Sequence, residues 1–382
     1  MRVLHISRGK VYGGLETLLV TLARQRSLCP AMEPEFALCF DGRLRQELEA
    51  TAAPVHMLGH ARVSRPISTW KARRALARLL AGGRYDVAVC HLAWAQAIFG
   101  PVVRRAGVPL IFWLHGATSG RHWLERWARL TSPDLAICNS TFTAGFLPNL
   151  YNGIPAAVLH NPVMAPPVLH NPGRSAVRAE TNTREDTVVI IQVSRMEHGK
   201  GHRVHIEALA QLKDLPNWIC WQVGGAQGPA ERRYIESLVE LAEARGIKDR
   251  IRFVGQRSDV WRLLQAADVF CQPNTEPEGF GLCFVEALYA GLPVITAAFG
   301  SAKEVLNGSC AILVPPGDVR ETASALRALI LNSRLRLKLS EAAPRHAIAL
   351  GSPNIALRKL HSYISEQFAT ARTLSNPSAA ES

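Results

Sequence analysis

Short apolar runs alternate with longer amphipathic stretches along the whole chain. The run at residues 3–6 leads through a glycine-containing loop into a helical pattern over residues 15–25, and similar helical patterns cover residues 202–212 and 232–245. Short continuous apolar runs between such stretches are typical of buried parallel strands. They recur at residues 87–90, 110–114, 135–138, 188–193, 219–223, 251–254, 269–271, 294–296 and 312–314.

This alternation predicts an α/β fold with two doubly wound, parallel-sheet domains. A stretch rich in proline, glycine and polar residues separates the two halves, as interdomain linkers do. It holds a near-repeat, because Val-Leu-His-Asn-Pro occurs at residues 158–162 and again at 168–172. We interpret the first copy as the end of the first domain and the second as linker. The predicted parts are a first domain at residues 1–165, a linker at 166–186, a second domain at 187–352 and a flexible tail at 369–382.

Charge is unevenly distributed between the halves. The chain of 382 residues has 44 Lys and Arg against 31 Asp and Glu, a formal net charge of +13, and most of the excess falls in residues 1–170. Such a field attracts an anionic partner, for example an acidic membrane surface, a phosphorylated substrate or nucleic acid. A merely solvated basic face is the alternative. Residues 50–85 contain no acidic residue but hold Arg62, Arg65, Lys71, Arg73, Arg74, Arg78 and Arg84.

Composition excludes several classes of protein. With 48% hydrophobic residues, 28 Gly and 23 Pro, the chain is neither disordered nor collagen-like. Its first apolar stretch is too short for a signal peptide, and no run of 18 apolar residues follows. The eight cysteines form no CxxC pair, so we expect buried reduced thiols, no metal site and a cytoplasmic protein.

Two loops that follow predicted strands carry features of anion-binding sites. Gly13 and Gly14 precede a predicted helix, where glycine lets the backbone approach a ligand and helix amides favour an anion. A tight turn would explain the same pair. Arg195 and Lys200 lie five residues apart in a loop with Gly199 and Gly201, so both cations can converge on one diphosphate. The alternative is a solvated surface loop.

Two further segments carry carboxylates and a histidine. Glu278 lies in a glycine-rich loop and Glu286 in the helix that follows. The amides of residues 280–282 can donate to sugar or phosphate oxygens at the start of that helix. His115 stands beside a glycine at a strand end, from where it could reach a substrate, although a structural histidine is equally compatible with the pattern.

In order and spacing these segments resemble the retaining glycosyltransferases of family four, over roughly residues 1–365. The resemblance implies the GT-B architecture, two Rossmann-like domains that face a cleft, with a helix near residues 353–368 that crosses back to the first domain. It implies transfer of a sugar from a nucleoside-diphosphate-sugar, a co-substrate, with no cofactor or metal. The matching pieces are residues 13–16, 86–91, 115–116, 139–140, 161–163, 194–201, 253–259, 278–286, 291–294 and 314–318.

The resemblance also assigns roles. The first domain would take the acceptor and the second the nucleotide-sugar. Two residues depart from the family pattern: Asn274 stands where serine is common, and Ser301 where a second glycine is common. Because of these two departures, the resemblance does not identify the donor sugar. The implied catalytic residues are Glu278, Arg195, Lys200 and His115, and the implied substrate-binding residues are Gly14, Gly255, Arg257, Phe280, Gly281, Leu282 and Glu286, with Glu286 on the ribose and residues 255–257 on the base.

The basic first half suggests a place of action. Residues 68–80 form a basic amphipathic helical pattern, and Trp123, Trp127 and Leu130 alternate with arginines. We hypothesise peripheral attachment to the inner face of the cytoplasmic membrane and a glycan or lipid-linked acceptor of the cell envelope, such as lipopolysaccharide or exopolysaccharide. Packing of both segments on the sheet would explain them equally.

Other functions remain compatible with the sequence. A nucleotide-sugar epimerase or a phosphorylase would use the same fold, and a non-catalytic sugar-nucleotide-binding protein would keep the same residues. A nucleic-acid-binding protein has only the net charge in its favour, because no recognised motif for nucleic acid is present, and we expect no nucleic-acid partner.

Overall fold

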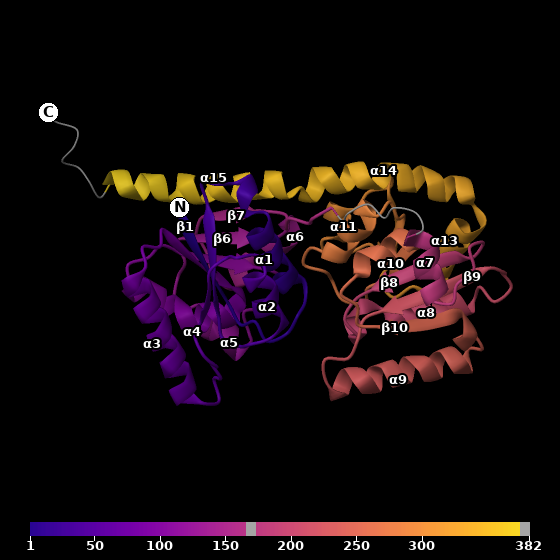
Figure 1. Ribbon diagram of the computed structural model, residues 1–382, viewed down its shortest axis with the longest axis horizontal. Coiled ribbons are helices and arrows are strands. Elements are labelled where there is room, and N and C mark those ends of the chain that lie inside the picture. Colours follow the sequence, from indigo (N-terminus) through magenta and orange to yellow (C-terminus); the bar gives the residue numbers. More distant parts are fainter. Residues whose placement is uncertain (166–172, 375–382) are drawn as a thin grey trace. The chain divides into compact units, whose positions relative to one another are not determined.

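The computed structural model describes residues 1–165 and 173–374 (Figure 1). The chain divides into two compact units. Unit 1 comprises Met1–Pro162 and Pro353–Ser382, and unit 2 comprises Val163–Ser352. The second copy of the near-repeat, residues 168–172, lies outside the described residues. Each unit is an α/β layer structure of its own, so the two are taken in turn.

Unit 1 contains a seven-stranded parallel sheet in the order β3-β2-β1-β4-β5-β6-β7. The order reverses between the neighbours β1 and β4, and in such sheets ligands bind beyond the carboxyl ends of the strands at that point. The strands are β1 (Arg2–Ser7), β2 (Glu33–Leu38), β3 (Val55–Met57), β4 (Val87–His91), β5 (Leu110–Leu114), β6 (Leu135–Cys138) and β7 (Ala156–Val158), and the helices are α1 (Gly14–Arg24), α2 (Arg43–Glu49), α3 (Pro66–Gly82), α4 (Leu92–Arg105), α5 (Trp123–Ala128), α6 (Thr141–Ala144) and α15 (Pro353–Leu374).

Unit 2 repeats this plan with a six-stranded parallel sheet in the order β10-β9-β8-β11-β12-β13. Here the order reverses between β8 and β11. The strands are β8 (Val188–Val193), β9 (Trp218–Val223), β10 (Ile251–Gly255), β11 (Val269–Gln272), β12 (Val294–Ala297) and β13 (Ala311–Val314), and the helices are α7 (Gly173–Glu180), α8 (His202–Ala210), α9 (Pro229–Ala244), α10 (Val260–Ala266), α11 (Leu282–Tyr289), α12 (Ala302–Val305), α13 (Val319–Leu331) and α14 (Ser333–Gly351).

Both sheets are apolar on both faces, as parallel sheets covered by helices must be. Consecutive strand residues enter opposite core layers: Val3 packs with α1 and α15, whereas Leu4 packs with α3 and α4. In unit 2, Ile190 and Ile191 separate in the same way. The two doubly wound parallel domains expected from the apolar runs are confirmed.

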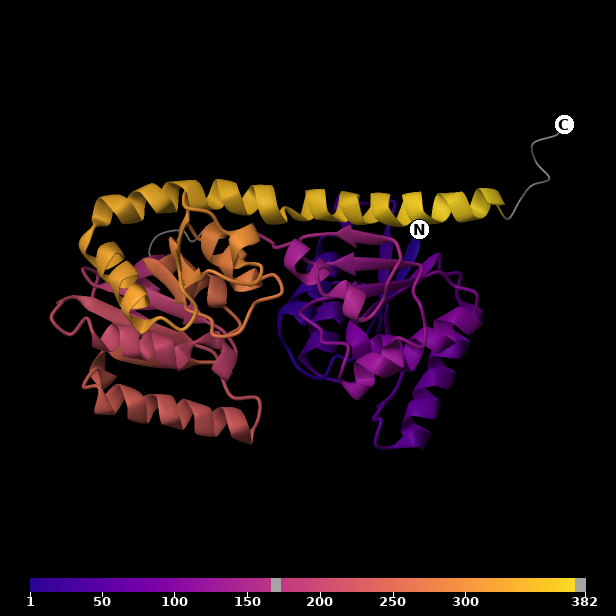
Figure 2. The same ribbon diagram turned by 180° about the vertical axis from the view of Figure 1, so that it is seen from behind.

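Helix α15 belongs to unit 1, although it follows unit 2 in the sequence. It runs along unit 1 in both views (Figures 1 and 2). Leu357, Leu360 and Ile364 are buried in the core layer that also holds residues of α1, and Tyr363 donates a hydrogen bond to the carbonyl of Val158. The helix extends to Leu374, into the segment predicted as a tail, and residues 375–382 lie outside the described residues.

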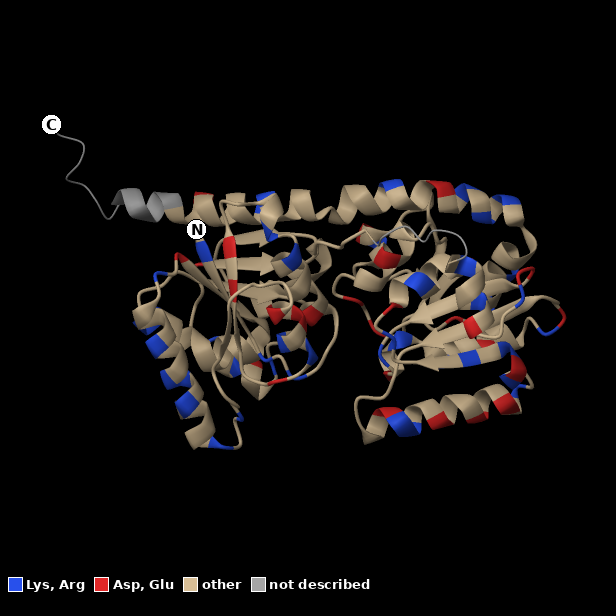
Figure 3. Ribbon diagram, in the orientation of Figure 1, with Lys and Arg blue, Asp and Glu red and all other residues tan. Residues whose placement is uncertain are grey.

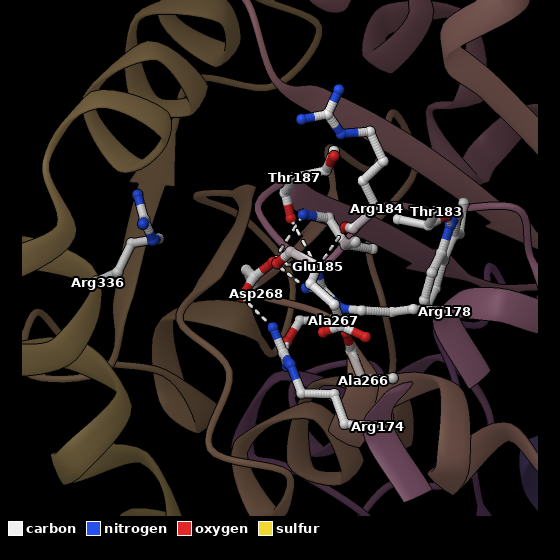
Figure 4. Close-up of polar contacts among 12 residues, drawn as sticks. Arg174, Arg178, Thr183, Arg184, Glu185, Thr187, Ala266, Ala267, Asp268 and Arg336 are labelled. Atoms are coloured by element: carbon white, nitrogen blue, oxygen red, sulfur yellow. Dashed lines mark hydrogen bonds and ion pairs between the residues drawn. The ribbon is translucent and has the colours of Figure 1, made fainter. Parts of the chain in front are cut away.

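The described part of the predicted linker is not a linker. Residues 173–186 lie within unit 2, and helix α7 is fixed to it by Arg178, whose side chain is fully buried. Its guanidinium donates to the Asp268 carboxylate and to four carbonyls, among them those of Ala266 and Thr187 (Figure 4). Arg178 can be buried in this polar stretch because backbone carbonyls take the place of water around its guanidinium.

Candidate functional site

Arg195 and Lys200 lie in the loop between β8 and α8, at the carboxyl edge of the unit 2 sheet. Gly201 ends this loop with φ of 72°, and a Cβ atom there would collide with the carbonyl of Pro273. Only glycine fits both conditions. The amide of Thr275 donates to the Gly199 carbonyl at 3.0 Å. The loop is therefore held against the segment that follows β11.

Lys200 and Glu278 meet as an ion pair, with the Lys200 ammonium donating to a Glu278 carboxylate oxygen. The amides of Gln272 and Asn274 approach the same oxygen at 3.4 Å. Burial lowers the pKa of Lys200, while the Glu278 charge and hydrogen bond raise it more, and the charge of Arg195 opposes them slightly; the net pKa is raised. Lys200 is thus a fixed cation at neutral pH, and the ammonium hydrogens that Glu278 does not bind can donate to an anion.

Arg195 has a different surrounding. Its guanidinium pairs with Glu197 at 2.6 Å, and its side chain is 42% exposed. Such an exposed pair is weak and readily exchanged for a better anion. Both cations are predicted to bind one ligand; they lie in one loop, where Lys200 pairs with Glu278 and Arg195 with Glu197.

The Glu278 loop passes into helix α11 through Gly281, which has φ of 81°. A Cβ atom there would strike the ring of Phe284, so the turn requires glycine. Phe280 is buried in the core and anchors the loop. Leu282 is the first residue of α11, where backbone amides have no intrahelical acceptor and can donate to a ligand.

Glu286 lies one turn into α11 and is half-buried. Among the described residues its carboxylate has no hydrogen-bond donor. Burial raises its pKa to about 7. A half-buried carboxylate without donors is suited to hydroxyl groups that a ligand brings.

The raised pKa of Glu286 predicts a pH effect on stability. The folded state holds this proton up to about pH 7, whereas the unfolded state releases it near pH 4.5. Stability therefore falls as pH rises between those values, by about 1–3 kcal/mol after allowance for partial exposure. In urea unfolding at pH 5 and pH 7.5, Glu286→Gln should show a smaller decline than the wild type. Equal declines in the two proteins would contradict the shift.

Beneath these loops lies a layer of polar side chains that the sequence analysis missed. Gln192 donates to the Lys200 carbonyl at 2.8 Å, and its own carbonyl oxygen contacts His205 Nδ1 at 2.8 Å. Ser194 and His202 meet at 3.0 Å. The detectable signal was a glutamine near the end of each of three adjacent buried strands, at Gln192, Gln222 and Gln272.

Arg257 lies in an ion-pair network at the end of β10. Its guanidinium binds both carboxylate oxygens of Asp259 at 2.7 and 2.8 Å and contacts Glu180 at 2.5 Å. The hydrogen bond from Arg257 lowers the pKa of Asp259 to about 2. This side chain ties α7 to the loop after β10, and its contact with a base stays a prediction. Gly255, at φ of 79°, ends β10 and leaves the backbone of that loop near the sheet edge.

Unit 1 carries the remaining predicted residues at the carboxyl edge of its own sheet. Gly14 begins α1 after β1, and the Gly13 amide donates to Glu16 at 3.0 Å. His115 follows β5 and contacts His91 at 2.9 Å. Burial lowers the pKa of His115 to about 3, so its imidazole is neutral at pH 7.

Residues 1–165 and 173–374 contain no cluster of three or more His, Cys, Asp or Glu side chains with the geometry of a metal site. Within the same ranges, no helix combines the length and the apolar character that a membrane span requires.

Comparison with known families divides the chain at the same place as the fold. Residues 173–346 match the family Glycosyl transferases group 1, and residues 12–164 match Glycosyltransferase Family 4. The D-inositol 3-phosphate glycosyltransferase of Kribbella flavida is 30% identical over 305 residues, which are 74% of this chain and 71% of that protein. The lipopolysaccharide core biosynthesis glycosyltransferase LpsE of Rhizobium meliloti is 30% identical over 165 residues, 43% of this chain and 46% of that one.

A solved structure agrees over nearly the whole length. Anabaena Alr3699/HepE in complex with UDP-glucose superposes with a TM-score of 0.85 at 23% identity, covering 96% of this chain and 100% of that one. At that identity the likeness concerns the fold, which is GT-B. With both halves matched in order and a relative aligned over most of its length, the chain belongs to the family-four, group 1 glycosyltransferases.

Proposed function

We propose that this glycosyltransferase moves a hexose from a UDP-sugar to a cell-envelope glycan with retention of anomeric configuration. The observation that carries the proposal is the loop between β8 and α8 of unit 2. In this loop Lys200 is fixed by Glu278, and Arg195 lies in the same loop. A complex of HepE with UDP-glucose supports the choice of donor. LpsE, named for lipopolysaccharide core biosynthesis, supports the choice of acceptor.

In the proposed reaction the bond between the sugar anomeric carbon and the diphosphate oxygen breaks while the acceptor oxygen bonds to the same carbon. Negative charge grows on the departing diphosphate, and the cations Lys200 and Arg195 stabilise it. The acceptor hydroxyl passes its proton to that phosphate, so no protein base and no metal is needed. Glu278 positions the donor sugar together with the amides of residues 280–282.

Binding of the nucleotide would use Glu286. Its carboxylate, which accepts no hydrogen bond from the described residues, would accept two from the ribose hydroxyls. These bonds favour the charged form of the carboxylate. Because the pKa of Glu286 in the folded protein without ligand is about 7, donor binding should release protons near neutral pH.

A panel of UDP-, GDP- and ADP-sugars tests the donor. Since a ligand that binds only the folded state stabilises it by about 2.7 kcal/mol at 100 times Kd, UDP-glucose or a related UDP-sugar should raise Tm clearly. Glu286→Ala should abolish the shift. Glu341→Ala, on the exposed face of α14, is the matched control and should keep it. If none of the UDP-sugars raises Tm, the assignment of the donor is contradicted. Isomerised sugar formed from the donor alone, without acceptor, would indicate an epimerase.

We further propose that unit 1 binds an anionic membrane surface. Helix α3 buries Thr69, Ala72, Leu76 and Leu80 and leaves Ile67 and Trp70 exposed, at 72% and 56%. Basic residues recur along this helix (Figure 3), and Lys71, Arg74 and Arg78 are exposed. The Arg73 guanidinium lies over the Trp127 ring at 5.5 Å. The two aromatic-basic segments are therefore neighbours, which supports one combined surface.

Flotation with vesicles that contain anionic lipid measures this binding. The wild type should float at low salt and detach as salt rises. The double variant Trp70→Ser/Arg74→Ser should lose roughly tenfold in binding, since each surface cation contributes about 1 kcal/mol and the indole adds to it. Leu337→Ser/Arg334→Ser, an exposed pair on α14, is the control. A wild type that stays in solution at low salt would refute the proposal.

A further inference from the structure

Three histidines in unit 1 form a continuous chain from the core to the sheet edge. His5 Nδ1 lies 3.0 Å from His91 Nε2, and His91 Nδ1 lies 2.9 Å from His115 Nε2. The rings are stacked, with centroids 5.3 and 5.2 Å apart. His5 and His91 are 0% and 2% exposed, whereas His115 is half-buried. They stand on the adjacent strands β1 and β4 and just after β5.

Neutral imidazoles in such a chain have coupled tautomers. Burial lowers the pKa of His5 and of His115 to about 3 and that of His91 well below its ordinary value, so all three are neutral at pH 7. A neutral ring has one N–H donor and one acceptor nitrogen. Because each ring bonds its neighbour through opposite nitrogens, all three must carry their proton on Nδ1, or all three on Nε2.

The buried end of the chain decides between these two states. His5 Nε2 is buried and has no hydrogen-bond partner among the described residues. With protons on Nε2, this end would be a buried N–H without an acceptor, which proteins tolerate less often than an acceptor without a donor. With protons on Nδ1, the end is a bare lone pair, and both internal hydrogen bonds are kept.

We propose that His5 and His91 are positioning residues that hold His115 as the Nδ1–H tautomer, which offers a hydrogen-bond donor to an oxygen of a substrate bound at the carboxyl edge of the unit 1 sheet. This inference rests on the proposed function for the identity of the ligand. His115 Nδ1 has no partner among the described residues, and the backbone beside it is fixed because Asn139 donates to the His115 carbonyl at 3.1 Å. The donor direction is thus set in advance of binding.

Nitrogen-15 NMR of the ligand-free protein labelled at histidine reads the tautomers directly. Signals are assigned with His5→Phe, His91→Phe and His115→Gln. The proposal expects His115 of the wild type to be protonated on Nδ1 and bare on Nε2. Protonation of His115 on Nε2 overturns it. Because no ligand is present, this outcome is independent of the donor screen, in which failure of the proposed function would appear separately.

A double-variant cycle separates positioning from a merely structural role. His91→Phe should lower kcat/KM about tenfold, the size of one neutral hydrogen bond. In the His115→Gln background the same change should cost less than twofold, because the glutamine amide donates whatever stands at position 91. Equal losses in the two backgrounds would show that His91 acts only through the fold and would overturn the proposal.

Discussion

Lys200→Ala is expected to lower kcat by about 10²- to 10³-fold while the protein remains folded. The Lys200 ammonium is held in the loop between β8 and α8 because it binds Glu278, and the Lys200 backbone carbonyl accepts a hydrogen bond from Gln192. Removing one preorganised group that faces developing negative charge typically costs this much. The measurement is nucleotide release in the presence of acceptor, with circular dichroism to verify the fold.

Two comparisons sharpen that result. Lys338→Ala removes an exposed lysine of α14 and should leave kcat unchanged. Arg195→Ala should cost less than Lys200→Ala, because the Arg195 side chain is 42% exposed and its pair with Glu197 is local. Near-normal turnover of Lys200→Ala would remove this residue from the chemistry.

Arg178→Ala is expected to lower the free energy of unfolding by about 3–5 kcal/mol. Its side chain is fully buried and binds Asp268, and the substitution removes one of the two guanidiniums on that carboxylate and leaves several carbonyls without this donor. Breaking a buried pair on one side has a cost of this size. Because whole domains are stable by only about 5–15 kcal/mol, urea unfolding should show a large shift of midpoint.

Arg174 supplies the matched control, since it binds the other oxygen of the same carboxylate at 2.7 Å while 42% exposed. Arg174→Ala should cost at most about 1 kcal/mol. If both variants lose the same small amount, the buried guanidinium does not hold α7 in place.

The fold was largely predictable because most strands are continuous apolar runs. Strand β2 shows why some were missed: it contains Pro34 and the buried Glu35, which breaks the apolar run. The Glu35 carboxylate is satisfied by Arg2 and Tyr85, residues 33 and 50 positions away. No local pattern reveals such partners, because they become neighbours only when the sheet forms.

The candidate site was also predictable only in part from the sequence. Glycines at 201 and 281 marked the two loops, and their left-handed backbone explains why those positions stood out. The pairing of Lys200 with Glu278 joins residues 78 positions apart, and the engagement of Arg257 by Asp259 and Glu180 depends on where α7 lies. The histidine chain likewise requires the strand order β1-β4-β5, which the sequence pattern alone does not state.

The central claim is that the diphosphate of the donor lies against the loop between β8 and α8. A crystal structure with bound UDP-glucose tests it most directly. We expect diphosphate oxygens within hydrogen-bond distance of Lys200 Nζ and the Arg195 guanidinium, with the ribose at Glu286. A diphosphate bound elsewhere, with Lys200 still paired only to Glu278, would contradict it.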